Sequence, residues 1–437
     1  MPDAQCDVLI IGGGPAGSTA AALLANLGHR VTLLEKSRHP RFHIGESLLP
    51  ANLPLFRRLG VEDDIRAIGM KKPGAEFVSP WHTGKRVFNF SEAWNKSMPF
   101  AYQVRRSEFD EILFRKAAAN GASTIEGCRV RDVKFDADGA TVSAQHQDDR
   151  VETWRTRFVI DASGRDTFLG NRFKAKQRNP RHNSAAMYAH FSGARRNSGE
   201  AEGNITICWF EHGWLWFIPL LDGATSVGAV SWPYYMNTRG ERSPEQFFID
   251  TIALCPELQE RLENAKLVSG VEATGNFSYA CDRTNGPGYL LLGDAYAFID
   301  PVFSSGVMLA MNSAFMGAET VDTCLRRPEE APKALARFDK AMKHGPREFS
   351  WFIYRVTNPA MRDLFMAAPP SGQMREAVLS MLAGDIFAGT PIWGALRRFK
   401  LLYYAASALN LKRSLGDWRR RKRINRPLRS DAMAGSK

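Results

Sequence analysis

The chain begins with apolar runs that alternate with glycine-rich and helix-like stretches. Residues 6–11 are almost all apolar and predict a buried parallel strand. A glycine cluster at residues 12–17 follows, then an alanine-rich helix to about Asn26 and a second apolar strand over residues 30–34. This order predicts a strand–helix–strand unit of about 30 residues, which is the building block of a parallel sheet.

The same signals recur further along the chain. Residues 105–119 have the apolar periodicity of an amphipathic helix, and residues 157–161 and 288–293 are short apolar runs that predict two more buried strands. A long helix is expected from Gly306 to about Leu325. Beyond residue 345 the pattern is again helical, with several proline breaks.

The middle of the chain has a different period. Residues 185–232 alternate apolar and polar positions, which predicts antiparallel strands with one face on the core and one face in solvent. The expected strands are Asn204–Phe210, Trp214–Leu220 and Thr225–Ser231. A sheet-rich unit is therefore expected inside a discontinuous parallel α/β unit.

Composition limits the class of protein. Hydrophobic residues make up 44% of the 437 residues and charged residues 24%, which is ordinary for a globular protein. No uncharged apolar run reaches the roughly 18 residues of a membrane-spanning helix, and residues 1–6 lack the basic start of a secretory signal. The six cysteines are scattered without a CxxC pair, so we expect no metal site, no disulfide framework and a cytoplasmic location.

Positive charge is in excess and is concentrated near the end of the chain. The formal net charge is +12, which favours acidic partners by long-range attraction. Residues 418–423, Arg426 and Arg429 form a basic tail. This tail is either a solvated charge run or a contact for anionic lipid headgroups or an acidic carrier protein. Nucleic-acid binding is not expected, because no recognition module accompanies the charge.

The glycine cluster is the first chemical motif. Its GxGxxG spacing, between a predicted strand and a predicted helix, lets the backbone approach a pyrophosphate and gives it the N–H groups of a helix N-terminus. Glu35 closes the second strand, where a carboxylate accepts hydrogen bonds from ribose hydroxyls and disfavours a 2′-phosphate. FAD or NAD is therefore expected. The residues expected at this part of the site are Gly12, Gly14, Ala16, Gly17, Glu35 and Lys36.

Distant segments favour FAD over NAD. Residues 161–165 (Asp-Ala-Ser-Gly-Arg) and 293–295 (Gly-Asp-Ala) each follow a predicted strand and resemble later fingerprints of FAD-dependent aromatic hydroxylase-type enzymes. The resemblance implies that Asp294, with Gly293 before it, lies on the ribityl or pyrophosphate part of FAD. Residues 103–110 are similar to the family segment whose arginine, here Arg106, reaches the flavin.

Two segments resemble the flavin-dependent halogenases of this superfamily. Residues 213–220 carry Trp-x-Trp-x-Ile-Pro; its two indoles, Trp214 and Trp216, project to one face of a strand and could keep a substrate away from the flavin. Residues 298–306 carry Phe-x-x-Pro-x-x-Ser-x-Gly before a predicted helix, whose N–H groups suit a small anion. The resemblance places a halide at Ser304, Ser305 and Gly306, and the flavin against Pro301, Gly306 and Val307.

A third segment supplies a lysine. Residues 71–77 resemble the halogenase stretch with a catalytic lysine two residues before Gly-Ala; Lys72 matches, and Lys71 stays an alternative. An ammonium can hydrogen-bond hypohalous acid, whereas a neutral amine, favoured by burial, can form a haloamine. The Gly-Glu-Ser stretch that ends at Ser47 is typical of the halogenase and reductase branch, where it lies over the flavin.

One position departs from part of the family. Tryptophan halogenases carry a glutamate where this chain has Phe303. A carboxylate that could orient attack on an indole is therefore missing. The resemblance is to the shorter branch that acts on phenols, pyrroles and carrier-tethered rings.

The sequence is thus identified as a member of the flavin-dependent halogenase family. The resemblance implies that a separate flavin reductase supplies reduced FAD, that dioxygen and chloride or bromide give hypohalous acid, and that Lys72 presents the halogen to an electron-rich phenol or pyrrole, which an acyl carrier protein could tether. The alternatives are a single-component flavin monooxygenase (hydroxylase), a geranylgeranyl-reductase-like flavin reductase and a non-catalytic scaffold. Residues 401–411 could form an interfacial amphipathic helix at a membrane surface or pack on the catalytic domain.

The expected fold class is α/β, with a Rossmann-type FAD-binding domain, an inserted antiparallel β-sheet substrate domain and a C-terminal helical region. The FAD-binding domain is expected over residues 1–77, 100–180 and 281–345, the substrate domain over 78–99 and 181–280, and the helical region with its basic tail over 346–437.

Overall fold

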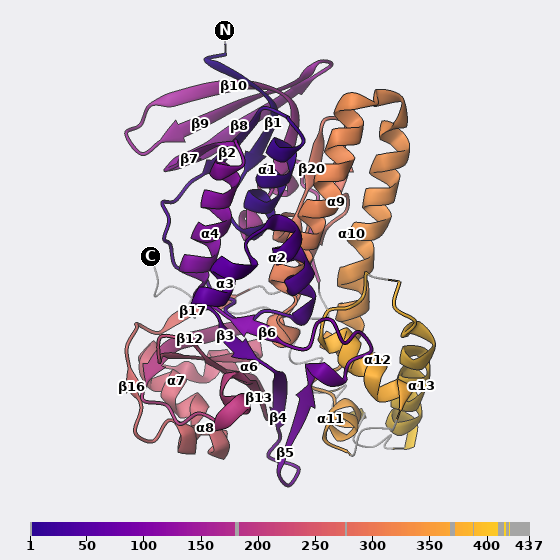
Figure 1. Cartoon of the computed structure of the whole chain (residues 1–437). Helices are drawn as coiled ribbons and strands as arrows, with labels where there is room; N and C mark the ends of the chain where they lie inside the picture. The colour runs from indigo at the N-terminus through magenta and orange to yellow at the C-terminus, as the bar shows by residue number, and fades with distance from the viewer. Residues whose placement is uncertain are drawn as a thin grey trace.

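A mainly parallel sheet forms the upper half of the molecule in Figure 1. The computed structural model describes residues 2–179, 183–275, 278–367, 372–387, 389–409, 415–416 and 419. The strands of this sheet lie in the order β19 (Asn285–Gly286), β20 (Tyr289–Leu291), β10 (Val151–Asp161), β1 (Ala4–Ile11), β2 (Val31–Glu35) and β7 (Ser123–Glu126). All neighbours from β20 to β7 are parallel, so the expected α/β class is confirmed.

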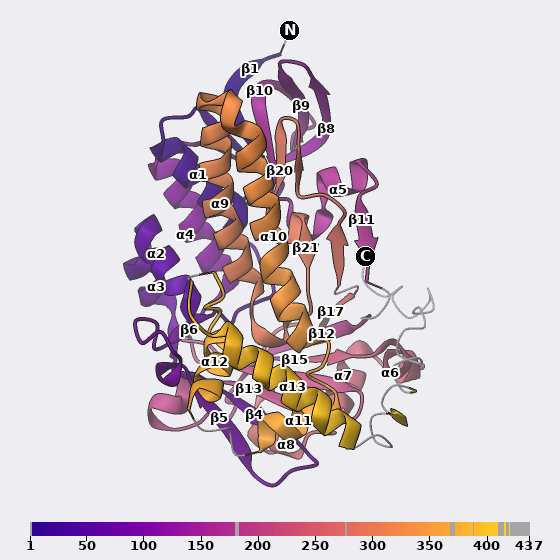
Figure 2. The ribbon, with the colours of Figure 1, turned by 90° about the vertical axis from the view of Figure 1, so that its right-hand side faces the viewer.

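Helices cover this sheet because its central strands are apolar on both faces. The long pair α9 and α10 lies side by side in Figure 2, and α1 packs against both α9 and α4. The expected helices over 105–119 and from Gly306 to about Leu325 are confirmed. The bounds are α1 (Pro15–Asn26), α4 (Arg106–Ala119), α9 (Gly306–Arg326) and α10 (Ala331–Ile353), and the antiparallel strands β8 (Cys128–Asp136) and β9 (Gly139–His146) extend the sheet beside β10.

The turn between β1 and α1 is held by glycines that no larger residue can replace. Gly12 has a φ of +100°, and a Cβ there would lie 2.5 Å from the carbonyl oxygen of Ala162. A Cβ at Gly17 would lie 1.9 Å from the carbonyl oxygen of Gly12. The first helical turn therefore presses directly on the end of β1, which is the close approach that a dinucleotide loop needs.

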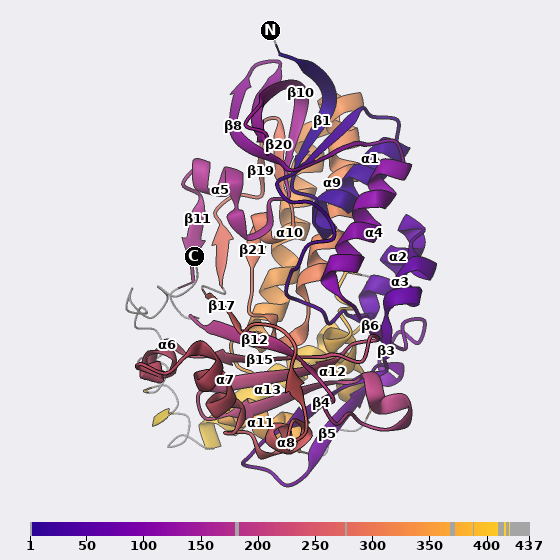
Figure 3. The same cartoon turned by 90° about the vertical axis from the view of Figure 1, so that its left-hand side faces the viewer.

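A second sheet forms the lower half of the molecule (Figure 3). Its strands lie in the order β16 (Lys266–Leu267), β12 (Ala185–Ser192), β15 (Thr225–Ser231), β14 (Gly213–Pro219), β13 (Ile205–Phe210), β4 (Gly74–Val78) and β5 (Lys85–Asn89), and β17 (Glu272–Gly275) also pairs with β12. The three strands expected in the middle of the chain are confirmed to within a residue. Most pairs are antiparallel, but β4 and β13 are parallel.

The prediction that one face of this sheet meets solvent is wrong. Every residue of β13, β14 and β15 is buried, because helices cover both faces (Figure 3). Two of the polar positions that suggested a wet face form internal hydrogen bonds: Thr206 Oγ1 donates to Glu76 Oε2 at 3.1 Å, and Ser226 Oγ accepts from Trp216 Nε1 at 3.2 Å. The covering helices are α7 (Pro244–Ile252) and α8 (Pro256–Arg261) on one face, and α11 (Pro359–Met366), α12 (Gln373–Leu382) and α13 (Trp393–Leu409) on the other.

A short ribbon joins the two sheets. It pairs β3 (Met70–Lys72) with β6 (Ala101–Gln103), and Ser47 bridges to Gln103 on the other edge of β6. The division of the chain into sequence ranges stays a prediction. The pairing places all of β4 in the second sheet, and α10 runs without a break through Pro346.

Three further expectations concern membrane-spanning helices, the cysteines and the basic tail. Within the described ranges, no helix has both the length and the apolarity needed to cross a bilayer. All six cysteines carry free thiols. Residues 420–437, which hold most of the basic tail, lie outside the described residues.

Candidate active site

A cavity of about 940 Å³ is lined by residues from both sheets. The expected cofactor residues that line it are Gly12, Gly14, Ala16, Glu35, Lys36, Ser47, Arg106, Asp294, Pro301, Gly306 and Val307. Two expected residues stand behind the wall instead. Gly17 packs on Gly12, and Gly293, at a φ of +53°, donates its N–H to Ser313 Oγ at 2.9 Å.

The dinucleotide end of the cavity has open donors and a fixed carboxylate. Helix α1 begins after Gly14, and no side chain caps its first N–H groups. Glu35 accepts hydrogen bonds from the backbone N–H of Gly13 at 2.7 Å and of Ser37 at 2.9 Å, which fix its carboxylate at the cavity wall. Lys36 forms an ion pair with Asp166. Uncapped helix donors beside a held acid fit the pyrophosphate and ribose of FAD.

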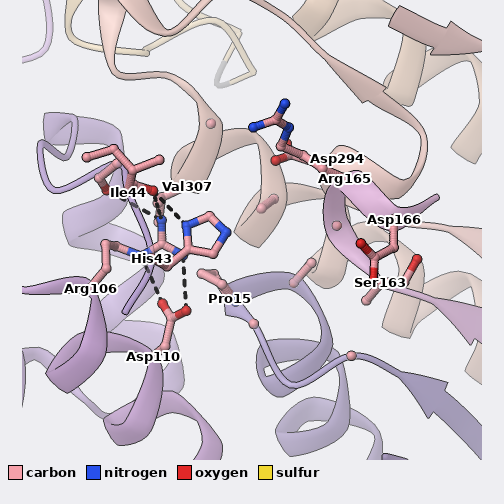
Figure 4. A pocket seen from close by; sticks show the side chains of 18 of the residues that line it. Pro15, His43, Ile44, Arg106, Asp110, Ser163, Arg165, Asp166, Asp294 and Val307 are labelled. Carbon is pink, nitrogen blue, oxygen red and sulfur yellow. Dashed lines mark hydrogen bonds and ion pairs between the residues drawn. The ribbon is translucent and has the colours of Figure 1, made fainter. Parts of the chain in front are cut away.

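An arginine–aspartate pair lies on one side of the cavity (Figure 4). Arg106 donates from Nε and Nη2 to the two oxygens of Asp110, at 2.9 and 3.1 Å, and Arg41 Nη1 donates to Asp110 Oδ2 at 3.1 Å. Burial alone would raise the pKa of the Asp110 carboxyl, but the two guanidinium groups outweigh burial and hold that pKa below its usual range. Arg41 Nε also lies 3.7 Å from Glu35 Oε1, so this network joins the acid of the dinucleotide end to Arg106.

Asp294 lies on the opposite side of the cavity, next to Arg165 in Figure 4. Burial raises the pKa of Asp294 to about 6. A carboxyl with this pKa can donate or accept a hydrogen bond near neutral pH, which fits a chain of ribityl hydroxyls.

Among the cavity residues that the sequence analysis did not predict as site residues are Arg41, Asp110 and Arg165, although Asp110 and Arg165 close two of the segments that resemble the family. The spacing of Arg106 and Asp110 by four residues on one predicted helix was a usable signal for their pairing. Arg41 and Arg165 gave no comparable signal, because their partners are distant in sequence. Within the described ranges, no group of three His, Cys, Asp or Glu side chains is arranged to hold a metal ion.

Trp214 and Trp216 form one wall of the cavity. Both are buried, and their ring centroids are 5.9 Å apart. Trp216 lies over Gly228, its partner on β15, where a Cβ would come within 2.1 Å of the indole. The missing side chain at Gly228 therefore makes room for a flat indole, which a hydrogen bond to Ser226 then holds.

The segment before α9 combines a left-handed residue with an unpaired hydroxyl. Ser304 has a φ of +56° and lines the cavity together with Gly306. Ser305 lies just behind them, and its buried Oγ has no hydrogen-bond partner among the described residues. No side chain caps the first turn of α9. An unpaired buried donor at an uncapped helix N-terminus fits a small anion.

Lys72 is buried behind the cavity wall. Its Nζ donates to Ser47 Oγ at 2.8 Å and to the carbonyl oxygen of Leu48 at 2.9 Å, and it lies 5.4 Å from the ring centroid of Phe90. Its side chain is 1% exposed, and burial lowers the pKa of the amine to about 7. Lys72 does not line the cavity, but Ser47 does. The alternative, Lys71, is exposed beside Phe100.

The burial of Lys72 makes stability depend on pH in a defined window. The amine titrates at about 7 in the fold but near 10.5 when exposed, so between these values the unfolded chain binds more protons. The free energy of unfolding should therefore rise with pH across this window, by roughly 1 kcal/mol per pH unit from this group. We expect wild type to gain stability relative to Lys72→Met between pH 7 and 9, as measured by urea unfolding of the FAD-loaded proteins.

The matched control is Lys71→Met, because the Lys71 ammonium is exposed. Its stability difference from wild type should stay constant across the same pH range. Parallel pH curves for wild type and Lys72→Met would show that Lys72 keeps an ordinary pKa.

Comparison with known proteins agrees with this geometry. A family model described as an FAD binding domain matches residues 5–329. The chain is 29% identical over 412 residues to the 1H-pyrrole-2-carbonyl-(peptidyl-carrier protein) chlorinase of Pseudomonas fluorescens, covering 89% of this chain and 91% of that protein. It is 35% identical over 404 residues to the flavin-dependent halogenase gsfI of Penicillium aethiopicum, covering 84% of this chain and 73% of that protein.

A solved structure shows the same arrangement of elements. The myxobacterial chondrochloren halogenase CndH matches with a TM-score of 0.77 at 30% identity, over 92% of this chain and 97% of that one. The expectation of an FAD-dependent oxidoreductase with halogenase motifs is confirmed by these relatives. This chain belongs to the flavin-dependent halogenases, a family of FAD-dependent enzymes.

Proposed function

We propose that the protein halogenates an electron-rich phenol or pyrrole, and that Lys72, Trp214 and Trp216 carry the transfer. The observation that supports this most directly is the buried Lys72 amine, 2.8 Å from Ser47 in the cavity wall. Bound reduced FAD supplies the electrons with which dioxygen oxidises chloride or bromide to hypohalous acid. The remaining steps concern the side chains of this chain.

The cofactor and halide positions follow from the cavity. In this proposal the uncapped end of α1 holds the pyrophosphate, Glu35 holds the ribose, and Arg106 and Asp294 hold the flavin side. Ser304, Ser305 and Gly306 hold the halide at the N-terminus of α9, where the unpaired Ser305 Oγ supports the assignment.

The tryptophan wall separates oxidation from transfer. Trp214 and Trp216 are buried and packed, so an aromatic substrate on their far side is kept from the flavin, whereas hypohalous acid is small enough to move past Ser47. Lys72 then receives it. The protonated amine holds hypohalous acid by a hydrogen bond. The neutral amine, available because the pKa is about 7, can form an N–halogen bond as the O–halogen bond of hypohalous acid breaks and water leaves.

The substrate side favours a ring that is already reactive. Phe303 stands where an orienting carboxylate would be needed, and its ring stacks on Phe365 at 6.4 Å. No charge therefore directs attack from this position, and the ring's own electron density must do so. The relative from Pseudomonas fluorescens is a chlorinase of a pyrrole on a peptidyl-carrier protein. A carrier-tethered pyrrole also suits the net charge of +12, since carrier proteins are acidic.

A separate flavin reductase is the proposed source of reduced FAD. The part of the chain that the structure describes contains one strand–glycine-loop–helix unit, formed by β1, α1 and β2. The cavity beside it is accounted for by FAD. We therefore expect no direct use of NADPH, in contrast to a single-component hydroxylase.

Removal of the amine should abolish halogenation and leave cofactor binding intact. With reduced FAD, dioxygen, bromide and a pyrrole substrate, either free or on its carrier, Lys72→Ala should form at least about 100-fold less halogenated product than wild type. Its FAD affinity, measured by flavin fluorescence, should match wild type. Lys71→Ala is the matched control and should retain activity.

Two results would contradict the proposal. Halogenation that persists in Lys72→Ala would remove the lysine from the transfer. Hydroxylated product formed with NADPH and without halide would show the single-component monooxygenase instead.

Loss of the Ser305 hydroxyl should weaken halide use specifically. A hydrogen bond to an anion contributes about 1.5 kcal/mol or more, so Ser305→Ala should raise the KM for bromide by roughly tenfold while the FAD affinity stays unchanged. Steady-state rates at varied bromide measure this. An unchanged KM for bromide would exclude Ser305 from the halide site.

Helix α13 is the proposed peripheral contact of a cytoplasmic enzyme with the inner face of a membrane. Its Leu396, Phe399 and Tyr403 pack on the fold, whereas Leu401 and Leu409 are 69% and 87% exposed. Helix α13 contains no acidic residue. An exposed apolar stripe on a basic helix suits an anionic lipid surface.

Vesicle flotation tests this contact. Wild type should float with phosphatidylserine-containing vesicles, and Leu401→Asp/Leu409→Asp should bind at least about tenfold less, because burial of two leucines is lost and charge repulsion is added. Leu254→Asp, at an exposed leucine outside α13, is the matched control. Equal flotation of the double variant and the control would rule out α13 as the contact.

A further inference from the structure

A buried acid–imidazole pair connects the second sheet to the segment that receives the Lys72 amine. Glu46 is 2% exposed and lines the cavity. His190 Nε2 lies 2.9 Å from Glu46 Oε1 and 3.1 Å from Oε2. A buried carboxylate without such a donor would be costly, so the position of Glu46 depends on His190.

The imidazole side of the pair is rigid. His190 lies within β12, where its N–H donates to Ser269 Oγ at 2.9 Å and its carbonyl oxygen accepts from Val268 at 2.9 Å. Alternate residues of a strand share a face, so His190 is on the same face as Tyr188, which lines the cavity. His190 is thus a fixed point of the second sheet.

The carboxylate side of the pair leads directly to Lys72. The carbonyl oxygen of Glu46 accepts from Val104 N at 2.8 Å, and Leu48 N donates to the carbonyl oxygen of Tyr102 at 3.0 Å. Residues 46–48 therefore run along one edge of β6, and β3 runs along the other. The Lys72 amine contacts Ser47 and Leu48, the two residues that follow Glu46.

Other charged groups near the pair are already engaged. Arg105 Nη1 is 3.9 Å from Glu46 Oε1, but its Nε donates to Asp222 at 2.8 Å. The hydroxyl of Tyr188 donates to Glu272 at 3.2 Å. His190 is consequently the closest donor to Glu46 and the one that determines its orientation.

We propose that His190 is a positioning residue: by holding Glu46 it fixes residues 46–48, and with them the two oxygens that receive the Lys72 amine. This inference deepens the proposed halogen transfer and rests on it for its catalytic meaning. A ribbon of two short strands is marginal without outside contacts. The tie between Glu46 and His190 therefore sets where the amine lies relative to the tryptophan wall.

The test compares side chains at residue 190 that can and cannot reach Glu46. Glutamine can donate an amide hydrogen bond over nearly the same distance, whereas asparagine is too short and leucine has no donor. The readout is the pH profile of Lys72 acetylation by acetic anhydride in the FAD-loaded protein, measured by peptide mass spectrometry. It reports on the amine without requiring halogenation.

We expect the acetylation midpoint near 7 in wild type and in His190→Gln. In His190→Asn and His190→Leu it should move up by at least about one pH unit, because the amine leaves its oxygens and meets water. His29→Leu, which breaks a similar His–carboxylate pair with Asp322 elsewhere in the fold, is the matched control and should match wild type. Should leucine prevent folding, asparagine still gives the result.

Two outcomes would overturn the positioning role. One is an acetylation profile of His190→Asn that coincides with wild type, and the other is a profile of His190→Gln that shifts as far as that of His190→Asn.

A turnover assay gives a second readout. His190→Asn should halogenate the ring about tenfold more slowly than wild type, while hypohalous acid, trapped by monochlorodimedone, still forms. Adding His190→Asn to Lys72→Ala should cause no further loss of ring halogenation. If wild type forms no hypohalous acid, the proposed function fails, whereas the acetylation profile still decides the role of His190.

Discussion

The burial of one amine is the constraint on which the rest of this site depends. An ammonium removed from water loses a large hydration free energy, and a carboxylate partner is the usual compensation. The two hydrogen-bond acceptors of Lys72 are instead neutral oxygens, from Ser47 and Leu48. The fold therefore keeps the pKa near 7, so that both protonation states of the amine are present at neutral pH.

That constraint requires a rigid frame, and two sheets supply it. The parallel sheet provides the glycine loop and its acid at one end of the cavity. The second sheet provides the indole wall and His190 at the other end. The β3–β6 ribbon lies between the sheets and carries the amine, so the position of Lys72 depends on both sheets. Complete burial of β13 to β15 limits such movements, because both faces are packed.

Local features of the sequence predicted most of the fold. The bounds of β15 were predicted to the residue, since a two-residue period and flanking turn residues are local signals. The solvent-facing side predicted for this sheet was wrong, because the helices that cover it come from residues 244–261 and 359–409 and leave no mark on the strands themselves. Small hydroxyl residues such as Thr206 and Ser226 count as polar positions in the sequence pattern and so predict exposure, but here they are buried and form internal hydrogen bonds.

The candidate site likewise contains residues that local sequence predicts and contacts that it does not. Gly12 and Gly17 could be predicted from the spacing of the glycine motif, whereas Lys72 was predicted from the resemblance of residues 71–77 to the family. Glu46 and His190 are 144 residues apart, so no local pattern in the sequence could predict their contact.

The arrangement also explains how a site without an orienting carboxylate can be selective. With Phe303 in that place, the proposed mechanism has no charge that directs the attack, and a weakly nucleophilic ring such as a benzene would gain nothing from binding. In the proposed function, however, the halogen is presented at one point only, the Lys72 amine behind Ser47. The electron density of the substrate ring then determines whether the ring reacts, and the place of the Lys72 amine determines which carbon is halogenated. A carrier-tethered pyrrole meets both conditions, because its electron density is high and its tether restricts which carbon can approach the amine. In this proposal the accuracy of the product depends on how firmly Lys72 is held, which gives the Glu46–His190 contact its importance.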